Sequence, residues 1–308
     1  MSMKNSVQSF SNETLLPLPC PVCGSQLHPL EGHVKAAGCF DDCLRRCETC
    51  GIGFSNSRSD QTRICRNRLD NIPVQVKCGV EETLLEALNE RNRANKKVKF
   101  GFSTSEDALT WTVFTFLRTS RQLGKVLRSI EIAGGSEGEG EPELLVWGVP
   151  QPPTSSPGGL IRKRIIGICD RLGEEPNRRS EPDVIVDFGQ FGLVLIEVKY
   201  RSGNDLQDFG KKHEKYLDGT DAFAEPQLIR DSRMYELARN WRIGVELANG
   251  APFTLVNLVV KSRESKQIAL FDSGLNHRKG QFRVLTWAQL VNHIEAPDWL
   301  EGYLKGTF

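Results

Sequence analysis

The chain has 308 residues, of which 39% are hydrophobic and 26% charged, and its formal net charge is +1. This composition is ordinary for a soluble globular protein, and the near-neutral charge gives no global argument for a polyanionic partner. No apolar run reaches the roughly 18 residues that suggest a membrane span. Residues 1–19 lack the charged start and apolar stretch of a signal peptide, so we expect a cytoplasmic protein.

Six of the nine cysteines lie between residues 20 and 50. Two Cys-x-x-Cys-Gly units, at 20–24 and 47–51, are separated by 23 residues. In each unit two thiolates can face one ion while the glycine permits a tight turn. The spacing predicts a small zinc-ribbon domain with one structural Zn²⁺ and no open coordination position, held by Cys20, Cys23, Cys47 and Cys50.

Other residues near these units leave alternatives open. Cys39 and Cys43 could replace one pair or could be buried thiols, and His28 and His33 are weaker candidate ligands. The reading without a metal is a set of reduced free cysteines.

Apolar periodicity and breaker residues predict the elements that follow. We expect helices at 80–97 and 103–123, a strand at 143–149, an exposed loop at 150–159, strands at 182–188 and 191–200, a helix at 225–241, a strand at 253–260, and a strand leading into a helix over 282–294. The domain boundaries expected from this order are a zinc ribbon at 1–75, a basic connecting helix at 76–100 and an α/β domain at 101–308.

The segment EPDVIVDFGQFGLVLIEVKY, residues 181–200, contains two apolar runs around a Gly-Gln-Phe-Gly turn, and charged residues interrupt both runs. Side chains alternate between the two faces of a strand, so Glu197 and Lys199 share one face. Pairing of the two strands through the turn would bring Asp183 close to both.

Two carboxylates beside an ammonium suit a specific chemistry. Carboxylates can hold Mg²⁺ or Mn²⁺, which also takes water and phosphate oxygens, and such an ion polarises a phosphodiester. The ammonium of Lys199 can orient the attacking water or stabilise charge that develops on phosphorus. The alternative is a solvated surface hairpin with a Glu–Lys pair.

Pro182-Asp183 followed by Glu197-Val198-Lys199 resembles the PD-(D/E)xK signature of the restriction-endonuclease-like nuclease superfamily. The order of elements over about residues 100–260 is similar to the core of that superfamily. The resemblance implies a mixed sheet flanked by helices, in which Asp183 and Glu197 bind Mg²⁺ or Mn²⁺ and Lys199 serves the attacking water.

The resemblance implies two further site residues. Glu106, with Asp107 as the alternative, matches an acidic residue on the first core helix, although a charge there also suits a helix start. Gln227, with Gln207 as its rival, matches a glutamine on the helix after the motif, although an ordinary surface glutamine explains it as well. Asp187 has no counterpart.

Basic residues are concentrated between residues 45 and 100, a stretch that contains twelve lysines and arginines and seven acidic residues. Such groups can contact phosphates, although most charge runs are solvated faces. Nothing identifies a base-reading element. The candidates for phosphate contact on the basic helix are Arg91, Arg93, Lys96 and Lys97.

Together these features predict a metal-dependent endonuclease that hydrolyses DNA phosphodiester bonds, with RNA as the second choice of substrate and restriction or anti-phage defence as a setting by analogy. A protein partner or a homo-oligomer is compatible with this reading, and a membrane partner is not expected. The alternatives are a nucleic-acid-binding protein with an inactive nuclease-like domain and a scaffold protein whose ribbon contacts a partner. An intact Asp, Glu and Lys set favours the enzyme.

Overall fold

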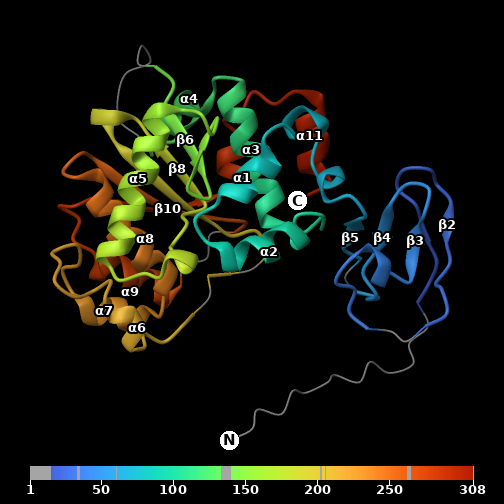
Figure 1. Ribbon diagram of the computed structural model, residues 1–308, viewed down its shortest axis with the longest axis horizontal. Helices are drawn as coiled ribbons and strands as arrows, with labels where there is room; N and C mark the ends of the chain where they lie inside the picture. Colours follow the sequence, from blue (N-terminus) through green and yellow to red (C-terminus); the bar gives the residue numbers. More distant parts are fainter. Residues whose placement is uncertain are drawn as a thin grey trace, which may run out of the picture.

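The computed structural model describes residues 15–32, 35–59, 61–132, 140–201, 203–204, 206–261 and 265–307. The cysteine-rich N-terminal part carries small sheets, and the rest of the chain folds around one larger sheet (Figure 1). No helix in these ranges is long and apolar enough to cross a membrane.

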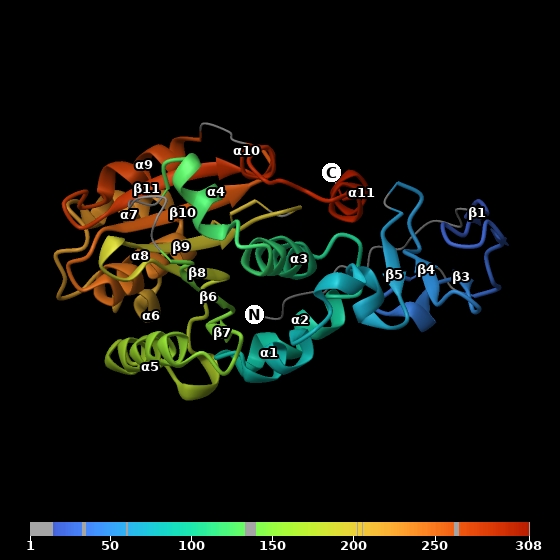
Figure 2. The same cartoon turned by 90° about the horizontal axis from the view of Figure 1, so that it is seen from above.

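The larger sheet has six strands in the order β11-β10-β9-β8-β6-β7, and Figure 2 shows them in this sequence. Strands β9, β10 and β11 are parallel, whereas β8, β6 and β7 run antiparallel to their neighbours, so the sheet is mixed. The strands are β6 (Glu143–Val146), β7 (Val149–Gln151), β8 (Val184–Asp187), β9 (Leu193–Val198), β10 (Phe253–Val259) and β11 (Gln281–Thr286).

Helices cover both faces of this sheet, which makes the fold mixed α/β. One buried cluster joins α1, α3, α4, α10 and α11 to alternate residues of β8, β9 and β10, and a second joins α5, α7, α8 and α9 to the other face. The helices are α1 (Val80–Glu86), α2 (Glu90–Lys99), α3 (Glu106–Thr119), α4 (Leu123–Ser129), α5 (Ser156–Arg171), α6 (Lys211–Glu214), α7 (Pro226–Ser232), α8 (Tyr235–Ala248), α9 (Lys266–Gly274), α10 (Trp287–Val291) and α11 (Asp298–Lys305).

The β8–β9 hairpin forms where the sequence predicts it. Its turn uses positive backbone angles at Gly189 (φ +63°) and Gly192 (φ +144°), which glycine adopts without a steric penalty. Val184 pairs with Ile196 in the antiparallel register, and one further step along the register places Asp183 opposite Glu197. The turn therefore brings the two carboxylates to the same end of the hairpin.

Helix α3 begins at the residue that its cap selects. Ser105 accepts a hydrogen bond from the backbone N–H of Ala108 at 3.1 Å, and Glu106 occupies the first turn. Most of the helix is buried, and the indole of Trp111 donates to the backbone carbonyl of Val76. Because the helix is fixed on several sides, the position of Glu106 is fixed with it.

The N-terminal part contains the two-stranded sheet β1–β2 and the three-stranded antiparallel sheet β3-β4-β5. The guanidinium of Arg45 is buried beneath them and donates to the backbone carbonyls of Leu16, Ser55 and Ser57, so this arginine is structural rather than a phosphate contact. The strands are β1 (Leu18–Pro19), β2 (Gln26–Leu27), β3 (Arg45–Cys47), β4 (Ile52–Phe54) and β5 (Arg63–Cys65).

The last strand of the small sheet is hydrogen-bonded to the segment that precedes α3. The N–H of Cys65 donates to the carbonyl of Gly101, and the N–H of Ser103 donates to the carbonyl of Arg63, both at 2.8–2.9 Å. The carboxamide of Asn71 donates to the carbonyls of Phe100 and Phe102. The segment at 100–103 is thus shared between the small sheet and the start of α3.

Three elements differ from the sequence-based expectation. The helix expected at 80–97 is divided into α1 and α2, since Asn89 caps a new helix by accepting from the N–H of Asn92. The helix expected at 225–241 is divided at Arg233, whose φ is +59°. The stretch expected as a loop at 150–159 contains the start of α5, which Ser155 caps.

Candidate functional site

Asp183 and Glu197 lie at the adjoining ends of β8 and β9, on the sheet face that packs against α8. The Asp183 carboxylate accepts a hydrogen bond from the backbone N–H of Val198 at 2.9 Å, so it reaches across to the motif strand. Burial raises the pKa of Asp183 well above its usual range, and the neighbouring charge of Glu197 raises it further. The structure therefore brings these two predicted residues together.

Lys199 lies between two carboxylates on the same face. Its ammonium is 2.8 Å from Glu197 Oε1 and 2.9 Å from Glu236 Oε2, and the side chain is 10% exposed. Burial lowers the pKa of Lys199, but the charges of Glu197 and Glu236 outweigh burial and hold the pKa above its ordinary value. Lys199 is a permanent cation in this arrangement.

Glu106 reaches the same cluster from the first turn of α3. Its carboxylate accepts a hydrogen bond from the backbone N–H of Tyr200 at 2.6 Å. Burial raises the pKa of Glu106 to about 7, while the charge of Lys199 and the Tyr200 hydrogen bond oppose the rise. The acidic residue expected from the first core helix thus lies beside the hairpin.

Lys96 is also part of the cluster, which corrects its expected role as a surface phosphate contact. Its ammonium is 2.7 Å from Asp107, 3.7 Å from Glu181 and 3.9 Å from Asp183, and its side chain is 14% exposed. Burial lowers the pKa of Lys96, but these three carboxylates outweigh it and the pKa is raised. A cation enclosed by carboxylates in this way does not present an open charge to a phosphate.

Helix α8 supplies two charged residues of the cluster and one amide that binds it, and the sequence reasoning missed all three. Glu236 pairs with Lys199, and the Asn240 carboxamide donates to Glu197 Oε2 at 2.7 Å. Arg239 donates to the carboxamide oxygen of Asn240, which fixes the direction of the amide. Glu236 and Asn240 are four residues apart and so share one helix face. Polar side chains at that spacing beside the buried Leu237 and Trp241 were the available signal.

Two glutamines expected as candidates lie elsewhere. Gln227, on α7, is exposed and donates to Asp231 at 2.8 Å. Gln207 is exposed as well, and its backbone N–H donates to the carbonyl of Arg233. Asp187 lies at the turn end of β8, where it accepts from the N–H of Gly189. None of the hydrogen bonds and ion pairs that the structure describes joins these three residues to the cluster.

We call the set described above the acidic cluster. It contains six carboxylates and three cations, so its formal charge is negative with every group ionised. Burial of carboxylates without enough cations is unfavourable, and the raised pKa values of Asp183 and Glu106 reflect this. A divalent cation would relieve the repulsion. The members are Glu106, Asp107, Glu181, Asp183, Glu197, Glu236, Lys96, Lys199 and Arg239.

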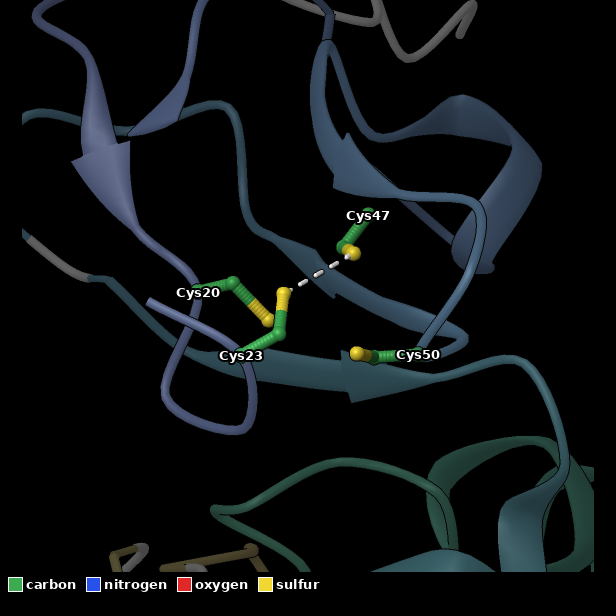
Figure 3. A group of neighbouring side chains, drawn as sticks. All are labelled: Cys20, Cys23, Cys47 and Cys50. Carbon is green, nitrogen blue, oxygen red and sulfur yellow. Dashed lines mark hydrogen bonds between the residues drawn. The ribbon is translucent and has the colours of Figure 1, made fainter. Parts of the chain in front are cut away.

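The four predicted cysteines lie together in the N-terminal part (Figure 3). Their sulfur atoms are all within 4.8 Å of one another, and the Sγ atoms of Cys23 and Cys47 are 3.8 Å apart. Four sulfurs at about 2.3 Å around one tetrahedral ion would lie about 3.8 Å apart. The cysteines can therefore hold a metal ion, and the geometry is compatible with structural zinc.

The local backbone forms the two tight turns that the motif requires. Gly24 has a φ of +74° and Gly51 a φ of +65°, and their N–H groups donate to the carbonyls of Cys20 and Cys47 at 2.9 Å. Hydrogen bonding to Ser25 lowers the pKa of Cys23 to about 6, which favours its thiolate. In the part of the chain that the structure describes, this is the only group of three or more His, Cys, Asp or Glu ligand atoms so closely placed.

The alternative ligands lie outside this group. Cys43 is buried, and burial raises its pKa to about 12, so it behaves as a buried thiol. Cys39 and His28 are exposed and do not belong to the close quartet. His33 lies outside the described residues.

Helix α2 carries the remaining candidates for phosphate contact. Arg91 is exposed and Lys97 half-buried, and neither takes part in an ion pair found among the described residues. Arg93 instead pairs with Glu90 at 2.6 Å and donates to the carbonyl of Leu85. The helix begins beside the acidic cluster, since the N–H of Asn89 donates to Glu181 at 2.9 Å. The start of α2 therefore lies beside the cluster.

Comparison of the chain with protein-family models, with curated proteins and with solved structures gives no match.

Proposed function

We propose that this protein is a Mg²⁺- or Mn²⁺-dependent nuclease of the PD-(D/E)xK type that hydrolyses DNA phosphodiester bonds. The observation that carries the proposal is the convergence of Asp183, Glu197 and Lys199 on one sheet face, with the Glu106 carboxylate of α3 accepting from the backbone N–H of Tyr200, the residue after Lys199. A surface hairpin would leave these groups in water. Here Glu197 and Lys199 are buried, and Asp183 and Glu106 are half-buried.

The donor set suits a hard cation with few protein ligands. Asp183, Glu197 and Glu106 offer carboxylate oxygens, and Mg²⁺ is commonly bound by one or two carboxylates together with water and substrate phosphate. When bound, the ion would polarise the phosphodiester and lower the pKa of a water molecule. Asp183 and Glu197 would hold it, and Glu106 would add charge beside them.

The other residues would position these ligands. Asn240 donates to Glu197 and so limits the directions that this carboxylate can take. Lys199 cannot ligate a cation as an ammonium, and its place beside Glu197 suits the orientation of the attacking water and the stabilisation of charge on phosphorus. Glu236 would hold Lys199 from the opposite side.

The N-terminal part would serve as a zinc ribbon. Four thiolates fill a tetrahedral shell, so a Zn²⁺ ion held there would have a structural role and would stabilise strands that are only two or three residues long. Arg91 and Lys97 of α2 would contact the DNA backbone beside the acidic cluster.

A cleavage assay tests the proposal with variants that keep the size of each side chain. Plasmid and single-stranded DNA are incubated with Mg²⁺ or Mn²⁺ and with Asp183→Asn, Glu197→Gln or Lys199→Met at equal folded concentration. Each variant should lose cleavage by about 100-fold or more, as expected when a charge that stabilises the transition state is removed. Ca²⁺ should support DNA binding with little hydrolysis.

Asp187→Asn is the matched control, because Asp187 lies on the same strand but outside the acidic cluster. Its cleavage rate should equal that of the wild type. Equal rates for Lys199→Met and the wild type would refute the mechanism. DNA binding without cleavage by the wild type in both metals would instead favour a binding module.

A further inference from the structure

A hollow of about 720 Å³ opens beyond the carboxyl ends of β9 and β10, directly after the motif strand. Ligands of parallel α/β sheets bind in the crevice at this edge, and the volume lies within the roughly 300–1,000 Å³ of small-molecule sites. Tyr200 and Arg201, which follow Lys199 along the chain, form part of its wall. The hollow therefore adjoins the acidic cluster without including its carboxylates.

Asn257 lines this hollow and lacks a hydrogen-bond partner for its side-chain oxygen. The residue is 1% exposed, and no partner for Oδ1 exists among the described residues. It is the register partner of Glu197 in the parallel β9–β10 pair, and it alternates onto the same face as Leu255 in the cluster against α8. Buried polar atoms are almost always paired, so an unpaired amide oxygen beside a hollow indicates that a ligand completes it.

The rest of the wall is apolar in the interior and positively charged at the rim. Met234 is buried, Ile268 and Val284 are half-buried, and all three give apolar surface. Arg201 and Lys261 are exposed cations at the rim. The side-chain amides of the wall belong to Asn204, Asn257 and Gln267. Apolar surface and amides inside, with cations outside, match a planar heterocycle joined to an anion.

Resting on the nuclease function proposed above, we propose that this hollow binds one unstacked nucleotide of the substrate strand, next to the bond that is cleaved. The amide of Asn257 has one acceptor and two donors, which suits the mixed donor and acceptor edge of a nucleobase. Arg201 and Lys261 meet the adjoining phosphate. An unstacked base is easiest to present from a single strand or a frayed end, so such DNA is the preferred substrate.

Ligand-observed NMR tests the pocket without any cleavage. The wild-type protein is titrated with each of the four deoxynucleoside monophosphates, with deoxyribose 5-phosphate and with inorganic phosphate, in the absence of added divalent metal. At least one nucleotide should show saturation transfer to its base protons in the millimolar range. Asn257→Ala should weaken that nucleotide about tenfold and leave deoxyribose 5-phosphate unchanged.

Arg201→Ala should weaken the nucleotide and deoxyribose 5-phosphate alike, whereas Lys163→Ala, which changes an exposed lysine of α5, should change neither. Should Asn257→Ala fail to fold, Ile268→Trp fills the hollow from a half-buried position and should abolish nucleotide binding. Absence of binding for all four nucleotides, or binding that both Asn257→Ala and Ile268→Trp leave intact, overturns the proposal.

The two proposals fail separately. If the protein cleaves DNA with metal but binds no nucleotide in the titration, the nucleotide-binding proposal is refuted and the nuclease proposal stands. If the protein cleaves no DNA but binds a nucleotide, and Asn257→Ala weakens that binding, the hollow is a nucleotide site and the catalytic proposal is refuted.

Discussion

Glu106→Gln tests whether the acidic cluster carries unfavourable charge before a metal binds. The pKa of Glu106 rises from 4.5 to about 7 in the folded chain, chiefly because the carboxyl is buried. At about 1.4 kcal/mol for each pKa unit, ionised Glu106 destabilises the fold by about 3 kcal/mol. Glutamine keeps an oxygen that can accept the N–H of Tyr200 and removes the charge.

The sign of the effect follows from the raised pKa. Below pH 4.5 the carboxyl is protonated in both the folded and unfolded chains, so the wild type and Glu106→Gln should be similarly stable. As the pH rises toward 7 the unfolded chain loses the proton first, and the wild type is progressively destabilised. Glu106→Gln should therefore be more stable by up to about 3 kcal/mol at pH 8, and this advantage should fall to about 1 kcal/mol at pH 5.

Urea unfolding between pH 5 and pH 8, without added Mg²⁺ or Mn²⁺, measures this difference. Glu141→Gln is the control, because Glu141 is exposed and lies outside the acidic cluster. A difference between Glu106→Gln and the wild type that stays constant across this range would show that the carboxyl is not buried in the way described. Mg²⁺ should then stabilise the wild type more than Glu106→Gln.

Four other changes address the metal centre and the DNA contacts. Cys47→Ser should remove the metal ion and lower the melting temperature, and unchanged zinc content with an unchanged melt would contradict the zinc ribbon. Lys97→Ala should weaken DNA binding about equally for all sequences and reduce the slope of log affinity against log salt by roughly one unit, so an unaltered slope would place α2 away from DNA. Lys96→Met should leave that slope unchanged. It should lower the free energy of unfolding in urea by about 3 kcal/mol at pH 8, because it removes the partner of buried carboxylates. An almost unchanged free energy of unfolding would show that Lys96 is exposed. Gln227→Ala should leave cleavage unaffected, and a tenfold loss of rate would place Gln227 at the site.

The sequence was sufficient to predict features that depend on residues close together in the chain. Strand alternation places Glu197 and Lys199 on one face, and the glycines at the turn allow the strands to pair. The Cys-x-x-Cys-Gly spacing likewise predicts both tight turns and the cysteine quartet. The α/β class follows from the alternation of strands and helices, since parallel neighbours need a crossover connection, usually a helix.

Local rules failed where the outcome depends on distant contacts. Helix α5 begins among prolines and serines that resemble a loop, yet Ser155 is an N-cap and proline is permitted in a first helical turn. The division between α7 and α8 needs a positive φ at Arg233, which no glycine signals. Lys96 looks like one cation of a basic run, and only the folding of α2 against Asp107 and Glu181 places it inside.

The hydrogen bonds between β5 and the segment at 100–103 decide where this chain can be divided. Removal of residues 1–75 would leave the N–H of Ser103 and the carbonyls of Gly101 and Phe102 without the partners that Arg63, Cys65 and Asn71 provide. These groups directly precede the cap of α3, and Glu106 is the next residue after that cap. A shortened chain would thus begin to fray at the end of the helix that carries Glu106. The cysteine-rich part therefore stabilises the start of α3, and the two parts of the chain should be expressed together.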